Sequence, residues 1–181
     1  MTLIASRLTS TPHQITTPVT LTGEVRHPNL RYRLELKSKN DSSLHGRLGG
    51  RIFGEELRLE VNGNDLLGTV IGSNVRLAVH ASLQREELHL RISGSSTATA
   101  FVHFSGDSGS GAWHSGDTVT QVNLTFSGDQ LTGRLSSGAT IRLESVSAPR
   151  WLTLSAALIG FIVTQVVDRT QLESLRGMDT L

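Results

Sequence analysis

Hydrophobic and polar residues alternate along most of the chain between Val19 and Val146. From Leu30 to Lys37, apolar side chains occupy every second position and charged side chains occupy the positions between them. A period of two is typical of a strand with one buried and one solvated face. Gly, Asn, Asp and Ser separate such segments about every eight to twelve residues, as turns require. The pattern predicts an all-β antiparallel domain of about twelve short strands.

A hairpin-sized pattern occurs three times. Residues Leu48–Leu59 align without gaps on Leu66–Leu77 and, with one inserted residue, on Leu131–Leu143. The shared pattern is Leu-x-Gly-x-aliphatic-x-Gly-x-x-aliphatic-Arg-Leu. We expect the second glycine to supply the positive φ of a tight hairpin turn. The pattern therefore predicts strand, turn and strand, without predicting a regular solenoid.

The segment from Arg150 to Val167 is the long apolar run of the chain, and it has no polar stripe. Ser147 is expected to cap a helix here, with Pro149 in its first turn. A helix that is apolar on all sides is buried in protein or in lipid. Its apolar part is about 24 Å long, short against the roughly 30 Å of bilayer hydrocarbon. A closed barrel of about twelve strands has a lumen too wide for its own side chains, so we expect the helix to fill it.

The predicted organisation has three parts. Residues 1–18 form an extended or disordered arm, residues 19–168 form one closed β-barrel domain with an axial helix at 150–167, and residues 169–181 form a polar tail with at most one helical turn. The helix residues expected to form the core are Trp151, Leu154, Leu158, Phe161, Ile162 and Val166.

A barrel of about twelve short antiparallel strands that ends in a hydrophobic C-terminal helix resembles the tubby-like fold, which includes LURP-one-related proteins and phospholipid scramblases. The strand count, the hairpin pattern and the apolar run up to Asp168 carry this resemblance over residues 19–168. It is a likeness of architecture, and no segment corresponds to a scramblase calcium segment or a phosphoinositide pocket. The resemblance implies binding to a lipid or a membrane surface without catalysis.

Composition narrows the class of function. The formal net charge of +1 does not favour nucleic acid as a partner, and the absence of cysteine excludes disulfides and thiolate metal sites. The first eighteen residues contain no apolar segment typical of a signal peptide, so a cytoplasmic location, also at the periphery of a membrane, is expected.

The densest group of basic residues lies near the start of the strand region. One interpretation is a contact with an anionic lipid headgroup through charge attraction. The alternative is a solvated strand face whose charges discourage aggregation. The candidate ligand-binding residues are Arg26, Arg31, Arg33, Lys37 and Lys39.

Two further patterns resemble catalytic or metal sites. Gly106-Asp-Ser-Gly109 resembles the nucleophile segment of trypsin-like serine proteases, with Ser108 as the nucleophile. However, Ser-Gly-Asp occurs at 105–107, 115–117 and 127–129, which is typical of turns. His80, His89 and His103 fall on three successive predicted strands but lack the close spacing of metal ligands. We therefore expect no catalytic residue, metal or cofactor.

These patterns favour a non-enzymatic β-barrel domain that binds phospholipid or a membrane surface. A structural or interaction scaffold, with a protein partner or a second copy of the chain, is one alternative. The other is a tail-anchored membrane protein with a soluble β domain, in which residues 150–167 would cross the bilayer.

Overall fold

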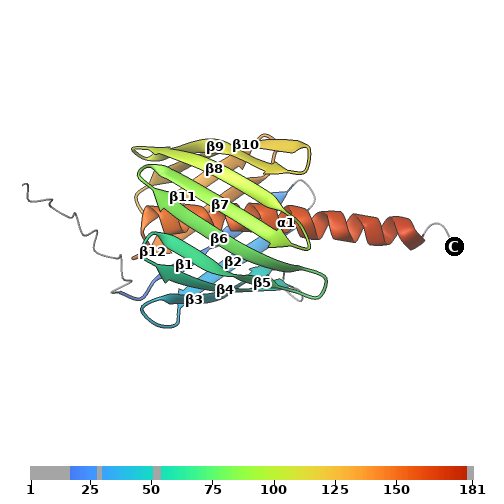
Figure 1. The fold of residues 1–181 in the computed structure, drawn as a ribbon, viewed down its shortest axis with the longest axis horizontal. Helices are drawn as coiled ribbons and strands as arrows, with labels where there is room; N and C mark the ends of the chain where they lie inside the picture. The colour runs from blue at the N-terminus through green and yellow to red at the C-terminus, as the bar shows by residue number, and fades with distance from the viewer. Residues whose placement is uncertain (1–16, 28–29, 51–53, 179–181) are drawn as a thin grey trace, which may run out of the picture.

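Twelve antiparallel strands close into one barrel around a single helix (Figure 1). The computed structural model describes residues 17–27, 30–50 and 54–178, with side chains as far as Val167. Consecutive strands pair along the chain, and the last strand pairs with the first over seven residue pairs to close the ring. The predicted fold class is confirmed. The elements are β1 (Thr20–His27), β2 (Leu30–Ser38), β3 (Ser43–Gly49), β4 (Gly54–Asn62), β5 (Asp65–Ile71), β6 (Arg76–Gln84), β7 (Glu87–Gly94), β8 (Ala98–Ser105), β9 (Ser108–Ser115), β10 (Thr118–Ser127), β11 (Gln130–Leu135), β12 (Thr140–Val146) and α1 (Arg150–Met178).

The alternation in sequence becomes an apolar lumen and a polar outer surface. In β2, Leu34 and Leu36 are completely buried, whereas Arg31 and Arg33 are exposed. The same alternation holds around the ring, which is the reverse of the lipid-facing apolar band of membrane barrels. The alternating apolar residues of the other strands are buried in the same way: Leu57/Leu59/Val61, Val75/Leu77/Val79, Leu88/Leu90/Ile92, Val122/Leu124/Phe126 and Ile141/Leu143.

Helix α1 runs through the lumen (Figure 1). Its segment from Arg150 to Val167 is long and apolar enough to cross a membrane, but 83% of it is buried inside the protein. The strands therefore cover the apolar surface that a tail anchor would present to lipid. Of the predicted core residues, Val166 is partly buried and packs against the core, and the others are buried: Trp151, Leu154, Leu158, Phe161 and Ile162.

The helix begins differently from the prediction. The carbonyl oxygen of Pro149 accepts hydrogen bonds from the amides of Leu152 (3.0 Å) and Thr153 (3.1 Å). Pro149 therefore occupies the cap position, immediately before the first helical residue Arg150. Ser147 lies further back with a φ of 59°, where it turns the chain from β12 into the barrel and does not cap the helix.

Arg150 fastens the start of α1 to the end of the barrel. Its guanidinium pairs with the carboxylate of Asp107 at 2.6 Å and donates to the carbonyl oxygen of Gly106 at 3.1 Å. It also lies over the ring of Phe126, 5.2 Å from the centroid. The turn between β8 and β9 and the end of β10 thus hold the first residue of the helix.

The helix continues well past the predicted end. Residues 168–178 extend α1 beyond the mouth of the barrel (Figure 1), so the prediction of a tail with at most one helical turn is wrong. Gln171, Leu172 and Glu173 are good helix formers, and no glycine or proline lies between Asp168 and Arg176. Residues 1–16 of the predicted N-terminal arm lie outside the described residues.

A glycine stands at the inward middle position of five of the six odd-numbered strands. An added Cβ on Gly46 would lie 1.8 Å from the carbonyl oxygen of Glu35, so the neighbouring backbone occupies the side-chain space. In each case two buried aliphatic residues of the flanking strands lie opposite the glycine. The sets are Gly23 with Leu34 and Leu143, Gly46 with Leu36 and Leu57, Gly68 with Leu59 and Val79, Gly111 with Val102 and Val122, and Gly133 with Leu124 and Ile141.

Strand β7 reverses this arrangement of sizes. Leu90 holds the equivalent middle position, and its two cross-strand partners are the buried alanines Ala81 and Ala100. A large residue on the odd strand is thus combined with small residues on its neighbours. This exchange keeps the lumen close-packed, as protein interiors require.

The true repeat of the barrel differs from the one predicted. The position equivalent to Gly68 is Gly46 and not Gly50, so the alignment of Leu48–Leu59 with Leu66–Leu77 is out of register. Gly54 and Gly72 are also not among the described residues with positive φ, whereas Gly138 has a φ of 88°. The repeat that the structure shows is apolar-x-Gly-x-apolar, in β1, β3, β5 and β11.

Replacing Gly46 by alanine is predicted to destabilise the barrel by about 3 kcal/mol or more, because its new methyl group meets backbone that cannot move independently. The measurement is the free energy of unfolding in urea. Gly109→Ala is the matched control, since a Cβ there lies 3.3 Å from a side-chain atom of Val102. Equal losses for the two variants would contradict this explanation of the odd-strand glycines.

Truncation tests the role of the helix. A chain ending at Ser147 is predicted to lose its cooperative unfolding transition, because the lumen then has nothing to fill it. A chain ending at Asp168 keeps the buried part of α1 and is predicted to unfold cooperatively, as the full chain does. Thermal unfolding followed by near-UV circular dichroism measures both. A folded, cooperative barrel without α1 would overturn the axial role.

Candidate anion-binding face

Closure of the barrel brings arginines from both ends of the strand region together. Glu24 of β1 lies opposite Arg33 of β2 on one side and opposite Arg142 of β12 on the other. Two residues further along β1, Arg26 lies opposite Arg31 of β2. All of these outward side chains therefore lie on the β2–β1–β12 sheet, with Glu24 among four arginines.

Strand β11 adds a fifth arginine. Arg26 pairs with Thr140 of β12, which pairs in turn with Arg134 of β11. Arg134 forms no ion pair with a residue that the structure describes. We call the surface formed by Arg26, Arg31, Arg33, Arg134 and Arg142 the arginine face.

Glu24 is held by two of these arginines. One carboxylate oxygen accepts from Nε of Arg26, and the other accepts from Nε of Arg31 at 2.5 Å. Partial burial alone would raise the pKa of Glu24, but the hydrogen bonds and positive charges of Arg26 and Arg31 together outweigh it and hold the pKa below its ordinary value. Glu24 is therefore ionised at neutral pH.

Two concavities lie on either side of Glu24. The larger, about 720 Å³, is lined by Arg31, Arg33 and Gly23, and the smaller, about 590 Å³, by Arg26, Arg134 and Gly133. Glu24 and Arg142 line both and form the wall between them. Threonine hydroxyls supply neutral hydrogen-bond donors to both concavities: Thr22, Thr125, Thr132 and Thr140.

The structure divides the predicted basic cluster. Arg26, Arg31 and Arg33 belong to the arginine face. Lys37 pairs instead with Glu35 at 2.6 Å, an interaction that lowers the pKa of Glu35 through its hydrogen bond and charge. Lys39 lies in the turn after β2, about 20 Å along the strand from Arg33, and does not line either concavity.

Sequence reasoning missed Arg134 and Arg142, although both hold polar positions in alternating segments. Closure of the predicted barrel places the last strands beside the first, and this was the signal in the sequence that could have brought Arg134 and Arg142 into the site. It gave no register between the first and last strands. The register decides which arginines meet.

The Ser-Gly-Asp triplets are turns, as predicted. Gly106, Gly116 and Gly128 have φ values of 58°, 57° and 59° between successive strands. Cross-strand register places Ser105 and Thr125 opposite Ser108. The geometry around Ser108 is that of a β-hairpin end.

The three predicted histidines share the outer surface without forming a metal site. His80, His89 and His103 lie on β6, β7 and β8, and His89 contacts the ring of Phe101 edge-on at 4.8 Å. Within the described residues, no three potential ligands are close enough to hold a metal ion.

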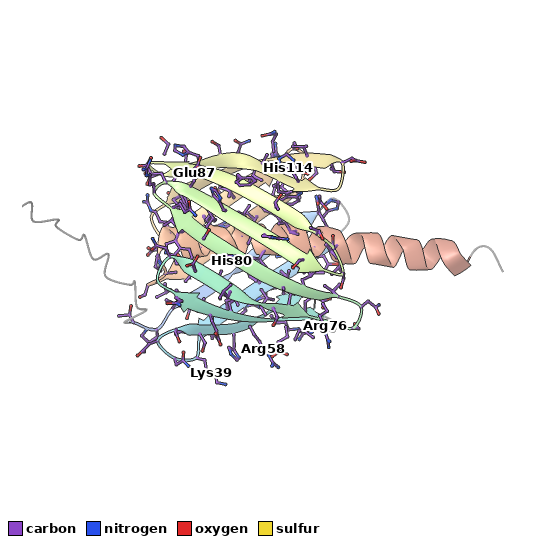
Figure 2. All side chains as sticks on the ribbon, in the orientation of Figure 1. Lys39, Arg58, Arg76, His80, Glu87 and His114 are labelled. Carbon is purple, nitrogen blue, oxygen red and sulfur yellow. The ribbon has the colours of Figure 1, made fainter. Side chains whose placement is uncertain are left out.

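Strands β8 to β10 carry little charge. Figure 2 shows His114 of β9 on this part of the barrel, and His80 and Glu87 on the neighbouring strands β6 and β7. From residue 92 to residue 133 the sequence contains no lysine or arginine, and its three acidic residues belong to the Ser-Gly-Asp turns. Lysine and arginine are therefore absent from this arc of the barrel.

Comparison with known proteins gives one distant likeness. No family model and no curated protein matches the chain. Among solved structures, the chain is similar to a LolA superfamily protein from Nitrosomonas europaea, with 13% identity, a TM-score of 0.33 and coverage of 71% of this chain and 83% of that one. The tubby-like resemblance is not confirmed by these comparisons. The candidate site accordingly rests on the geometry of the chain itself.

A buried carboxylate lies outside the arginine face. Glu55 shares the inward side of β4 with Leu57 and Leu59, and its Oε2 is buried without a hydrogen-bond partner among the described residues. Burial raises the pKa of Glu55 above its ordinary value, and the charge of Arg47 offsets part of this rise.

Glu55 is predicted to make the barrel less stable as pH rises. A carboxyl group whose pKa is raised by folding contributes stability that is complete below its unfolded value, near 4.5, and is lost as pH rises through the folded pKa. Glu55→Gln should therefore unfold at a higher temperature than the native chain at pH 7.5 and at a similar temperature at pH 4. A difference that does not vary with pH would show that titration of Glu55 is not its cause.

Proposed function

We propose that this chain is a non-enzymatic β-barrel domain that binds anionic lipid headgroups at a membrane surface through the arginine face. The observation that carries the proposal is the convergence of five arginines from four strands on two adjoining concavities, lined by only two glutamates, Glu24 and Glu144. Guanidinium groups suit phosphate because their donors match two of its oxygens at once.

The distribution of charge supports this assignment. The formal net charge of +1 gives no strong overall attraction to a polyanion, so attraction depends on where the arginines lie. A basic residue near an anionic membrane contributes about 1 kcal/mol, and its effect decays within a Debye length. One arginine-rich face and an arc of strands without basic residues, β8 to β10, orient the barrel toward such a surface. We place this binding in the cytoplasm, at the periphery of a membrane.

Reversing charge on the arginine face is predicted to weaken binding to phosphatidylglycerol-containing vesicles at least about tenfold. The variant is Arg31→Glu with Arg33→Glu, and co-sedimentation with vesicles measures the bound fraction. Added salt should weaken binding of the native chain, because both partners are exposed charges.

The matched control reverses two arginines elsewhere on the barrel. Arg76→Glu with Arg91→Glu makes the same change in net charge on β6 and β7, which lie across the ring from β1. This variant is predicted to bind as the native chain does. Equal weakening by the two double variants would mean that net charge, and not the arginine face, controls binding.

A protein-binding scaffold is a second candidate, favoured by a separate observation. Two of the exposed large apolar residues lie in the arc from β8 to β10 that lacks basic residues: Phe101 and Val119, with 50% and 52% of their surface accessible. Exposed aromatic and aliphatic side chains with few charges are typical of the centres of protein interfaces. Binding of the native chain to vesicles made of lipid alone would favour the first candidate.

A further inference from the structure

Glu24 places a negative charge at the centre of the arginine face. Its cross-strand partners are Arg33 and Arg142, and its two carboxylate oxygens already accept hydrogen bonds from Arg26 and Arg31. The low pKa of Glu24 keeps this charge in place at neutral pH. An incoming anion therefore meets arginines that have an internal partner.

The shared wall between the concavities determines how an anion can enter. Glu24 and Arg142 form that wall, so an anion that bridges both concavities takes the place of the Glu24 carboxylate at Arg26 and Arg31. A singly charged phosphodiester or carboxylate then replaces one negative charge by another and leaves Glu24 unpaired. The exchange brings such a group little net attraction.

A phosphomonoester differs in charge and in oxygen count. It carries about −1.5 to −2 charges near neutral pH and has three acceptor oxygens. It can replace Glu24 at Arg26 and Arg31 and still bring a second charge and a third oxygen to Arg33 and Arg142. The Glu24 carboxylate thus weakens the binding of singly charged groups more than the binding of doubly charged groups.

We propose that Glu24 makes the arginine face selective for phosphomonoester groups, such as the headgroup of phosphatidic acid, over phosphodiester and carboxylate headgroups. This selectivity rests on the anionic-surface binding proposed above. Glu24 acts as a specificity-determining residue, by competing with the ligand for two arginines.

The test compares vesicles of phosphatidylcholine that contain phosphatidic acid, phosphatidylglycerol or phosphatidylserine, matched in surface potential. Matching the potential removes the general effect of charge density. The full chain is predicted to bind the phosphatidic acid vesicles about fivefold more tightly than the other two at pH 7.4. Soluble glycerol 3-phosphate, added as a competitor, distinguishes a lipid headgroup from a free phosphate.

Two variants test whether the charge of Glu24 causes the selectivity. Glu24→Gln keeps the shape of the shared wall and removes its charge, and is predicted to bind all three vesicles more tightly while the preference falls to less than about twofold. Glu35→Gln is the matched control, because Glu35 is also ion-paired on the outer face of β2 but lines neither concavity. It is predicted to keep the full preference.

The outcomes separate this inference from the proposed function. Equal binding of the native chain to the three vesicles, or an unchanged preference in Glu24→Gln, would overturn the selectivity and leave membrane binding intact. No binding to any anionic vesicle would overturn both. Displacement from vesicles by glycerol 3-phosphate at micromolar concentration would support the phosphomonoester chemistry and assign it to a soluble ligand.

Discussion

The need to fill the lumen of a twelve-strand barrel governs the structure. Strand side chains alone cannot close so wide a space, and α1 supplies the missing apolar volume. The helix meets strands on all sides, so its buried segment must be apolar all round. Its small residue Gly160 faces the seam between β1 and β12, where an added Cβ would lie 3.1 Å from Val25 and 3.7 Å from Ile141. The first and last strands are thus joined by their own pairing and by packing on the helix.

Packing inside the barrel also shapes its outer surface. The inward glycines let the backbones of neighbouring strands approach where a side chain would not fit, and two of these glycines, Gly23 and Gly133, line the concavities of the arginine face. A glycine within a strand commonly marks a place where another backbone approaches closely. The residues that fit the strands together inside the barrel therefore contribute to the hollows outside it. Arginines on the same strands give these hollows their charge.

The period of two and the all-round apolar helix were sufficient to predict the closed barrel and its axial helix. Both signals are local, because burial on one face or on all faces is recorded in consecutive residues. The apolar-x-Gly-x-apolar repeat was missed because the aligned segments matched in composition but occupy different positions in their hairpins: Gly50 follows β3, whereas Gly68 lies within β5. The tail after Val167 was predicted incorrectly because polarity does not exclude a helix, and residues of this tail favour one.

Two of the five arginines of the candidate site could not be derived from the sequence for a different reason. Arg26, Arg31 and Arg33 are neighbours along the chain, but Arg134 and Arg142 join them only through the pairing of β12 with β1. That register depends on the number of strands and on the stagger of the whole ring. A local pattern contains neither quantity. The sequence therefore predicted a basic strand where the structure has a basic face.

Glu24 links the stability of this face to its chemistry. Arg26 and Arg31 lie directly opposite each other, and like charges in that relation destabilise a sheet. Glu24 relieves this repulsion by pairing with both, and its low pKa reflects the same attraction. Because folding lowers this pKa, the stabilising effect of Glu24 is present above its unfolded pKa and is lost as pH falls through the folded value. A barrel that gathers arginines at its seam thus needs an internal anion there, and any ligand of these arginines must compete with the residue that made their proximity tolerable.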